Sequence, residues 1–222
     1  METRGQARGG LRTLECGDVA ARLVVVMLHG RNMQAADLAP FGASLGIDAH
    51  FVFPDAPLAT DPGRTWWPVD SEARLRARGA RDLHAMDPPG RTQARTALHA
   101  LCETVAHGKR LALVGFSQGG MLALDYVLHG GRADALALLS STRIAFDEWR
   151  PLLPRLSGLP VLVAHGRADE ELSFAAGEAL RDAVRAGGAD VTWFPFEGGH
   201  GIPLPAWRAL RKFLTANLVA PT

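Results

Sequence analysis

The sequence predicts a single α/β domain, spanning residues 1–222, with a mostly parallel central sheet and helices on both faces. Two observations predict this fold class. Short, unbroken apolar runs recur along the chain, and stretches of about ten to fifteen residues with helical patterning separate them. A strand that is apolar throughout is buried on both faces, which is typical of a parallel sheet. Strands that alternate with helices in this way place the helices over both faces.

Six apolar runs are expected to form the strands. Residues 23–28 are the clearest case, because six apolar side chains, three of them valines, stand without interruption before His29-Gly30. A run of this length and composition fits a strand that is buried on both faces. The other five runs are residues 50–53, 111–114, 135–139, 161–164 and 191–194.

Four longer stretches are expected to form helices: residues 92–106, 119–128, 174–186 and 205–218. The last stretch carries large apolar side chains at helical spacing, namely Trp207, Leu210, Phe213 and Leu214. This spacing gathers them on one side of the helix and indicates a face that packs on the core.

Two stretches stand outside this alternation. Residues 54–90 contain five prolines beyond Pro54, two adjacent tryptophans and a charged segment at residues 72–81. An insertion of this length is a lid-like functional loop or a solvated surface excursion, and the sequence leaves both interpretations open. Residues 1–12 are rich in glycine and arginine, and we expect them to be flexible.

Composition excludes several classes of protein. Lys and Arg number 24 against 23 Asp and Glu, so nucleic acid and anionic membranes are not expected as partners. No apolar run approaches the ~20 residues of a membrane-spanning helix, and the N-terminus lacks the apolar segment of a signal peptide. The two cysteines, Cys16 and Cys102, fit neither a disulfide framework nor a metal site, which favours a cytoplasmic location. The oligomeric state stays open.

The most informative motif is a G-x-S-x-G pattern from Gly115 to Gly119, with Ser117 at its centre. In this pattern a strand turns sharply into a helix and lifts the serine above the sheet, while the glycines leave room for the turn. The apolar run before the motif and the helical stretch after it supply the required context. The pattern therefore predicts Ser117 as a nucleophile.

A nucleophilic serine needs a histidine that takes its proton and a carboxylate that orients the histidine. Three histidines follow Ser117 along the chain. His129 ends a helix, where a capping role is favoured, and His165 closes an apolar run, where it suits packing or loop support. His200 lies in a glycine-rich loop between the last strand and the final helix. The chain order serine, acid, histidine predicts His200 as the base.

The acid is expected on the loop after residues 161–164. Asp169, Glu170 and Glu171 stand there side by side. Asp169 is the predicted acid, because its short side chain loses the least rotamer freedom when it is fixed. The two glutamates suit the first turn of the next helix. Asp147 is a further alternative, although the start of a helix explains it better.

Two backbone N–H groups are predicted to stabilise a developing oxyanion. One belongs to Gln118, which follows the nucleophile at the N-terminus of a helix. The other belongs to Arg31, on the loop after residues 23–28, where Gly30 permits close approach. No histidines or carboxylates stand at metal-ligand spacing, so neither a metal nor a cofactor is expected.

These motifs together resemble the carboxylesterase/phospholipase branch of the α/β-hydrolases, which includes acyl-protein thioesterases and lysophospholipases. The residues that carry the resemblance are Leu28-His29-Gly30, Phe53-Pro54-Asp55-Ala56-Pro57, Thr65-Trp66-Trp67, Gly115-Phe116-Ser117-Gln118-Gly119-Gly120, His165-Gly166-Arg167-Ala168-Asp169 and Gly199-His200. The resemblance implies the α/β-hydrolase fold with little or no cap domain and a metal-free ester or thioester hydrolase. By position, it implies the triad Ser117, Asp169 and His200.

The chain departs from this family's usual pattern at three places: Arg31-Asn32-Met33-Gln34, Glu171-Leu172-Ser173 and Ser140-Ser141-Thr142-Arg143. All three are expected to line the cleft. Arg31 and Arg143 stand where the family usually has small or neutral groups. We therefore expect a cationic cleft mouth that favours substrates with a carboxylate or phosphate near the ester.

The leading functional hypothesis is a serine carboxylesterase that acts on small to medium acyl esters through an acyl-enzyme intermediate. Trp66, Trp67, Met121 and Leu172 are the candidate substrate-binding residues. A lysophospholipase or acyl-protein thioesterase is the alternative, and a non-catalytic ligand-binding protein of the same fold is an alternative of another class. The expected partner is a small-molecule acyl ester.

Overall fold

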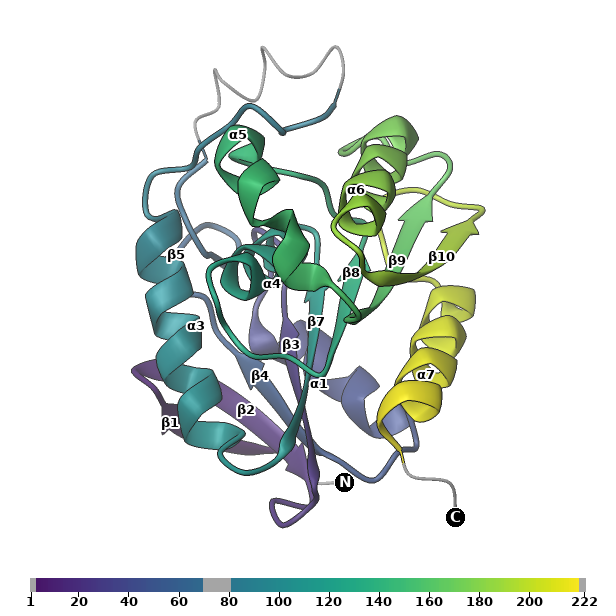
Figure 1. Ribbon diagram of the computed structural model, residues 1–222. Helices are drawn as coiled ribbons and strands as arrows, with labels where there is room; N and C mark the ends of the chain where they lie inside the picture. The colour runs from purple at the N-terminus through teal and green to yellow at the C-terminus, as the bar shows by residue number, and fades with distance from the viewer. Residues whose placement is uncertain (1–2, 70–80, 220–222) are drawn as a thin grey trace.

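The computed structural model describes residues 3–69 and 81–219, and it is built on one eight-stranded sheet in the order β1-β2-β4-β3-β7-β8-β9-β10 (Figure 1). Its strands are β1 (Arg4–Arg8), β2 (Leu11–Gly17), β3 (Leu23–Leu28), β4 (His50–Pro54), β7 (Arg110–Phe116), β8 (Ala135–Leu139), β9 (Pro160–Gly166) and β10 (Asp190–Phe196). The pairs from β4 to β10 are parallel, whereas β1 pairs with β2 and β2 with β4 in antiparallel fashion. The predicted α/β-hydrolase architecture is confirmed, and all six expected strands are present.

Helices cover both faces of this sheet. They are α1 (Ala35–Ser44), α3 (Arg91–Val105), α4 (Gln118–Leu128), α5 (Phe146–Trp149), the 3-10 helix η1 (Arg150–Leu156), α6 (Phe174–Ala186) and α7 (Leu204–Leu218). Figure 1 shows α3, α4, α5 and α6 in front of the strands, and α1 and α7 pack on the opposite face. None of the helices in the described part of the chain is both long and apolar enough to cross a membrane.

Strand β3 explains why the sheet is buried on both sides. Val24, Val26 and Leu28 belong to the core beneath α3 and α4, while the alternate residues Val25 and Met27 belong to the core beneath α1 and α7. Side chains alternate between the faces of a strand, so an unbroken apolar run fills two cores at once.

The N-terminal strands were not expected. Residues 1–12 were predicted to be flexible, but residues 4–8 form β1, and β2 begins at Leu11. Hydrogen bonds to a buried carboxylate hold this edge of the sheet, because Glu15 lies 2.9 Å from His50 Nε2 and accepts hydrogen bonds from Arg8 and Thr13. Burial alone would raise the pKa of Glu15, but these hydrogen bonds hold it below its ordinary value. In β2 the buried side chains alternate with more exposed ones, and one of the buried side chains is the charged Glu15. The strand therefore does not stand out as an apolar run in the sequence.

The stretch of residues 54–90 is only partly described, because residues 70–80 lie outside the described part of the chain. Before them, β5 (Leu58–Ala59) and β6 (Arg64–Thr65) form a small antiparallel hairpin. The interpretation of the whole stretch as a lid or a surface excursion therefore stays open.

Both cysteines, Cys16 and Cys102, are buried and free. The cytoplasmic location inferred from them stays a prediction.

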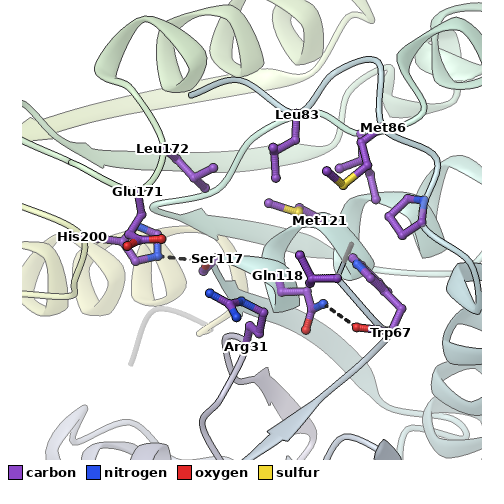
Figure 2. Close-up of a pocket in the computed structure, with 13 residues that line it drawn as sticks. Arg31, Trp67, Leu83, Met86, Ser117, Gln118, Met121, Glu171, Leu172 and His200 are labelled. Atoms are coloured by element: carbon purple, nitrogen blue, oxygen red, sulfur yellow. Dashed lines mark hydrogen bonds between the residues drawn. The ribbon is translucent and has the colours of Figure 1, made fainter. Parts of the chain in front are cut away.

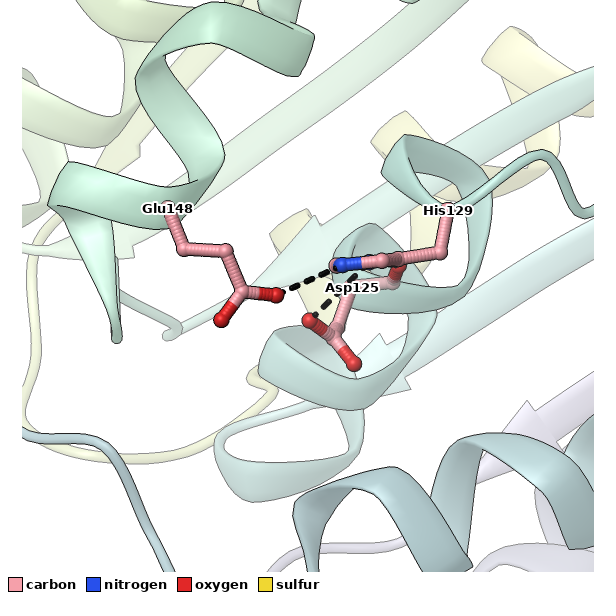
Figure 3. Close-up of side chains that lie close together, drawn as sticks. All are labelled: Asp125, His129 and Glu148. Atoms are coloured by element: carbon pink, nitrogen blue, oxygen red, sulfur yellow. Dashed lines mark hydrogen bonds and ion pairs between the residues drawn. The ribbon is translucent and has the colours of Figure 1, made fainter.

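A network of charged side chains joins α3, α4 and α5, on the face of the sheet that these helices cover. Asp125, His129 and Glu148 lie close enough together to suggest a metal site (Figure 3). Arginines already supply the positive charge, because Arg91 bonds to Asp125 and Glu148, and Arg95 bonds to Asp125 at 2.9 Å. The Trp149 indole N–H donates to the same carboxylate at 2.8 Å. We interpret the cluster as a structural ion-pair network.

Replacing Arg91 with alanine is expected to lower the free energy of unfolding by about 3 kcal/mol, because the buried Asp125 loses its ion pair with Arg91 and keeps the one with Arg95. Urea titration measures the change. Arg150→Ala removes a solvent-exposed partner of Asp147 and serves as the control, with an expected loss below about 1 kcal/mol. Equal losses for the two variants would contradict the structural role of the network.

Candidate active site

Ser117 stands at the sharp turn between β7 and α4, in a backbone conformation that few side-chain-bearing residues adopt (φ 53°, ψ −116°). The glycines of the motif make this turn possible. A Cβ atom on Gly115 would lie 2.4 Å from the carbonyl oxygen of Gly119, and a Cβ on Gly119 would lie 2.3 Å from that of Leu28. Because no side chain fits at either position, the motif predicted from sequence has a direct steric basis.

A continuous hydrogen-bond chain joins the three residues proposed as a triad. The Ser117 hydroxyl lies 2.9 Å from His200 Nε2, and His200 Nδ1 lies 2.8 Å from Asp169 Oδ2 (Figure 2 shows the first of these contacts). A carboxylate can only accept, so Nδ1 carries the proton and Nε2 is free to take one from the hydroxyl. Loops that follow three different strands of the sheet bring these side chains together.

Asp169 is fixed on both carboxylate oxygens. Its side chain is fully buried, and Oδ1 accepts hydrogen bonds from the backbone N–H groups of Glu171 and Leu172 at 2.9 and 2.8 Å. Oδ2 faces His200. Asp147 is exposed in the first turn of α5, where it pairs with Arg150. Glu170 and Glu171 precede α6, which begins at Phe174, so the expectation that they stand in its first turn is wrong, and Glu171 lines the cavity next to Ser117.

His165 contacts Asp169 on the side away from solvent, and this contact was not predicted from the sequence. It is fully buried, its Nε2–H donates to the backbone oxygen of Leu172 at 3.0 Å, and the same nitrogen lies 3.3 Å from Asp169 Oδ2. Burial lowers the pKa of His165, which favours the neutral ring. The predicted role in loop support agrees with this geometry.

The two predicted oxyanion donors belong to residues next to Ser117. Arg31 and Gln118 both line the cavity that Ser117 lines, and within the described residues neither backbone N–H has an acceptor. Gly30 permits the close packing of this loop, because a Cβ there would lie 2.9 Å from the Phe116 ring. The arrangement can place two N–H groups against a negatively charged oxygen.

A buried histidine holds the Arg31 loop in place. The His29 Nδ1–H donates to the Gly30 oxygen at 2.7 Å, and Nε2 accepts from the Ala56 N–H at 3.0 Å. Burial lowers the pKa of His29, so the neutral ring can donate at one nitrogen and accept at the other. Single-sequence reasoning missed this role, since the contact partners are 27 residues apart.

Trp66 is a correction to the predicted substrate-binding set. Its side chain is buried outside the lining of the cavity, and its indole N–H donates to the backbone oxygen of His29 at 2.8 Å. The backbone N–H of Trp66 donates to the side-chain oxygen of Gln118 at 3.0 Å. Trp66 therefore connects the loop that contains His29 and Arg31 with Gln118, and its side chain does not line the cavity.

The cavity next to Ser117 has a volume of about 190 Å³. Its polar lining residues are Arg31, Ser117, Gln118, Glu171 and His200. Its apolar lining residues are Trp67, Val69, Leu83, Met86, Pro88, Met121, Ile144 and Leu172. The predicted positions of Trp67, Met121 and Leu172 next to Ser117 agree with this lining, and residues of the 54–90 stretch supply much of the apolar side.

Arg31 and Arg143, expected to share the cleft mouth, are separated by the fold. Arg31 lines the cavity, whereas Arg143 lies outside its lining. Arg143 instead pairs with Asp82 at 2.6 Å and lies over the Phe146 ring. The prediction that both arginines line the cleft is therefore wrong for Arg143, whose charge is neutralised by its neighbour.

Comparisons with known proteins show the family and the fold of the chain. The Phospholipase/Carboxylesterase family model matches residues 11–218. Acyl-protein thioesterase 1 of Neurospora crassa is 30% identical over 114 residues, covering 49% of this chain and 46% of that protein, so the match spans about half of each. Esterase PE8 has a similar structure, with a TM-score of 0.78 at 26% identity over 98% of this chain and 100% of that one. Acyl-protein thioesterase 2 of Zea mays, at 22% identity over 93% of this chain and 99% of that one, shares the fold with a TM-score of 0.78.

Proposed function

Because the chain belongs to the phospholipase/carboxylesterase family, we propose that it is a serine hydrolase that cleaves small to medium acyl esters. The observation that carries the proposal is the hydrogen-bond chain from Ser117 through His200 to Asp169, which opens directly into an apolar cavity. A nucleophile, a base and an orienting acid in this order are the components of acyl transfer.

In the first step, Ser117 Oγ attacks the carbonyl carbon of the ester while its proton passes to His200 Nε2. The N–H groups of Arg31 and Gln118 bind the negatively charged oxygen of the tetrahedral intermediate. When the bond to the alcohol oxygen breaks, His200 returns the proton to that oxygen. The alcohol leaves, and the acyl group stays on Ser117.

In the second step, a water molecule attacks the acyl carbon and gives a proton to His200. The bond between the acyl group and Ser117 Oγ breaks, and His200 returns the proton to Oγ. Throughout both steps the buried carboxylate of Asp169 stabilises the imidazolium and keeps the ring oriented.

The size of the cavity supports a short to medium acyl group. Its volume of about 190 Å³ lies below the ~300–1,000 Å³ of pockets that enclose drug-sized ligands. Leu83, Met86 and Met121 form an apolar wall on one side of Ser117 (Figure 2). An acyl chain against this wall is removed from water, which favours binding by about 0.8 kcal/mol for each methylene.

An acyl-protein thioesterase or lysophospholipase is the second candidate, favoured by the 30% identity to a fungal acyl-protein thioesterase. The chemistry at Ser117 is the same for an ester and a thioester. The two candidates differ in the length of the acyl group that the cavity must hold.

A panel of 4-nitrophenyl esters from acetate to palmitate, with palmitoyl-coenzyme A as a thioester, distinguishes these functions. We expect kcat/KM to be highest for butyrate to octanoate and at least about tenfold lower for palmitate, whose chain exceeds the cavity. A maximum at the palmitoyl substrates would favour the second candidate. The absence of hydrolysis across the panel would contradict an enzymatic function and favour a ligand-binding protein.

A further inference from the structure

Arg31 places a positive charge in the wall of the same cavity that holds Ser117 and His200. Figure 2 shows its guanidinium next to Ser117, on the side away from Leu83 and Met86. The cavity therefore has an apolar end and a cationic end, with the nucleophile between them.

Within the described part of the chain, the guanidinium of Arg31 has no protein partner. Among residues 3–69 and 81–219, no acidic side chain lies within ion-pair distance of it, and it donates no hydrogen bond. Two other arginines with little exposure differ, since Arg91 pairs with Asp125 and Glu148, and Arg143 pairs with Asp82. Burial lowers the pKa of Arg31, which reflects a charge that is partly desolvated without compensation. An anionic group on the ligand would stabilise a cation in this position, because it would form charge-assisted hydrogen bonds with the partly desolvated guanidinium.

We propose that the Arg31 side chain binds a carboxylate or phosphate carried by the alcohol or thiol part of the substrate. This inference rests on the proposed function. The apolar end accepts the acyl chain, so the leaving group lies toward His200, which protonates it, and toward Arg31. A guanidinium binds either oxyanion with two parallel hydrogen bonds.

The charges of the cavity restrict where this anion lies. Arg31 supplies the guanidinium of the lining, and Glu171, on the loop after β9, is an acidic residue of the same lining. The anionic group of the substrate therefore sits beside the guanidinium of Arg31. The side chain of Arg31 acts separately from its backbone N–H, which Arg31→Gln and Arg31→Lys both retain.

The test compares two butyrate esters that share the acyl group and differ in charge: the ester of 3-hydroxybenzoate and the ester of methyl 3-hydroxybenzoate. A second pair, the butyrate esters of glycerol phosphate and glycerol, distinguishes phosphate from carboxylate. The readout is the ratio of kcat/KM for the anionic and the neutral member of each pair. Comparing this ratio between variants cancels the intrinsic reactivity of each ester.

Arg31→Gln is expected to lower the ratio by about tenfold or more, the effect of losing a charge-assisted hydrogen bond. Arg31→Lys keeps the charge without the bidentate geometry and should lower it less. Arg143→Gln, which removes a paired arginine outside the cavity lining, is the matched control and should change the ratio less than twofold. An equal ratio in wild type and Arg31→Gln for both pairs overturns the inference.

Calorimetric binding of 3-hydroxybenzoate to the Ser117→Ala protein tests the inference without turnover. Adding Arg31→Gln to that protein should weaken binding by about tenfold, with circular dichroism as the check on folding. Unchanged binding overturns the inference even if esters are hydrolysed. Failure of the proposed function has a different signature, because the wild-type protein then hydrolyses neither member of either pair.

Discussion

Replacing Ser117 with alanine is expected to lower kcat by about 10⁴–10⁶-fold, because the substitution removes the only hydroxyl that is hydrogen-bonded to His200 Nε2 among the described residues. Turnover of 4-nitrophenyl butyrate measures the loss. Folding should be preserved, since the change removes one oxygen atom and leaves the backbone at a positive φ that serine already adopts. The melting temperature should therefore stay within about 4 °C of the wild-type value.

Covalent labelling provides the control for this prediction. A fluorophosphonate probe should modify Ser117 and should fail to label the Ser117→Ala protein. Ser140 and Ser141, which follow β8, are the alternative candidates for the nucleophile. Both are buried, and their hydroxyls donate to the backbone oxygens of Gly201 and Ser117. Labelling of either serine in place of Ser117 would contradict the assignment of the nucleophile.

The parallel part of the sheet was predictable because its strands are buried on both faces. Residues 23–28 and 135–139 match β3 and β8 at both ends, since an apolar run ends where the chain leaves the core. Edge strand β1 escaped prediction because its side chains face solvent, and β2 because Glu15 points inward. An inward charge becomes understandable only when its partner His50, which is 35 residues away, is in place.

The same distinction applies to the candidate site. The positions of Ser117, Asp169 and His200 could be predicted because each stands on a loop after a strand, and the ends of parallel strands meet at one edge of the sheet. Side-chain direction was not predictable from the sequence. Two adjacent tryptophans illustrate this, because Trp67 lines the cavity whereas Trp66 turns into the core toward His29.

Replacing Asp169 with asparagine is expected to lower kcat by about 10⁴-fold with little change in folding. The backbone N–H groups of Glu171 and Leu172 require an acceptor at the Oδ1 position, so the asparagine oxygen must stand there. Its amide nitrogen then faces His200 Nδ1 as a donor. His200 must carry its proton on Nε2, which can no longer accept the proton of Ser117. Turnover measures the loss, and ¹⁵N chemical shifts of the imidazole report the change of tautomer.

Glu170→Gln and Glu171→Gln are the matched controls, because each removes one negative charge from the same loop. Each should lower kcat by less than about tenfold, or ~1.4 kcal/mol of activation free energy. Glu171 lines the cavity, but its backbone N–H, which supports Asp169, survives the substitution. A larger loss from Glu171→Gln than from Asp169→Asn would mean that the acid lies two positions further along the chain. An unchanged imidazole tautomer in Asp169→Asn would mean that the buried carboxylate does not orient His200.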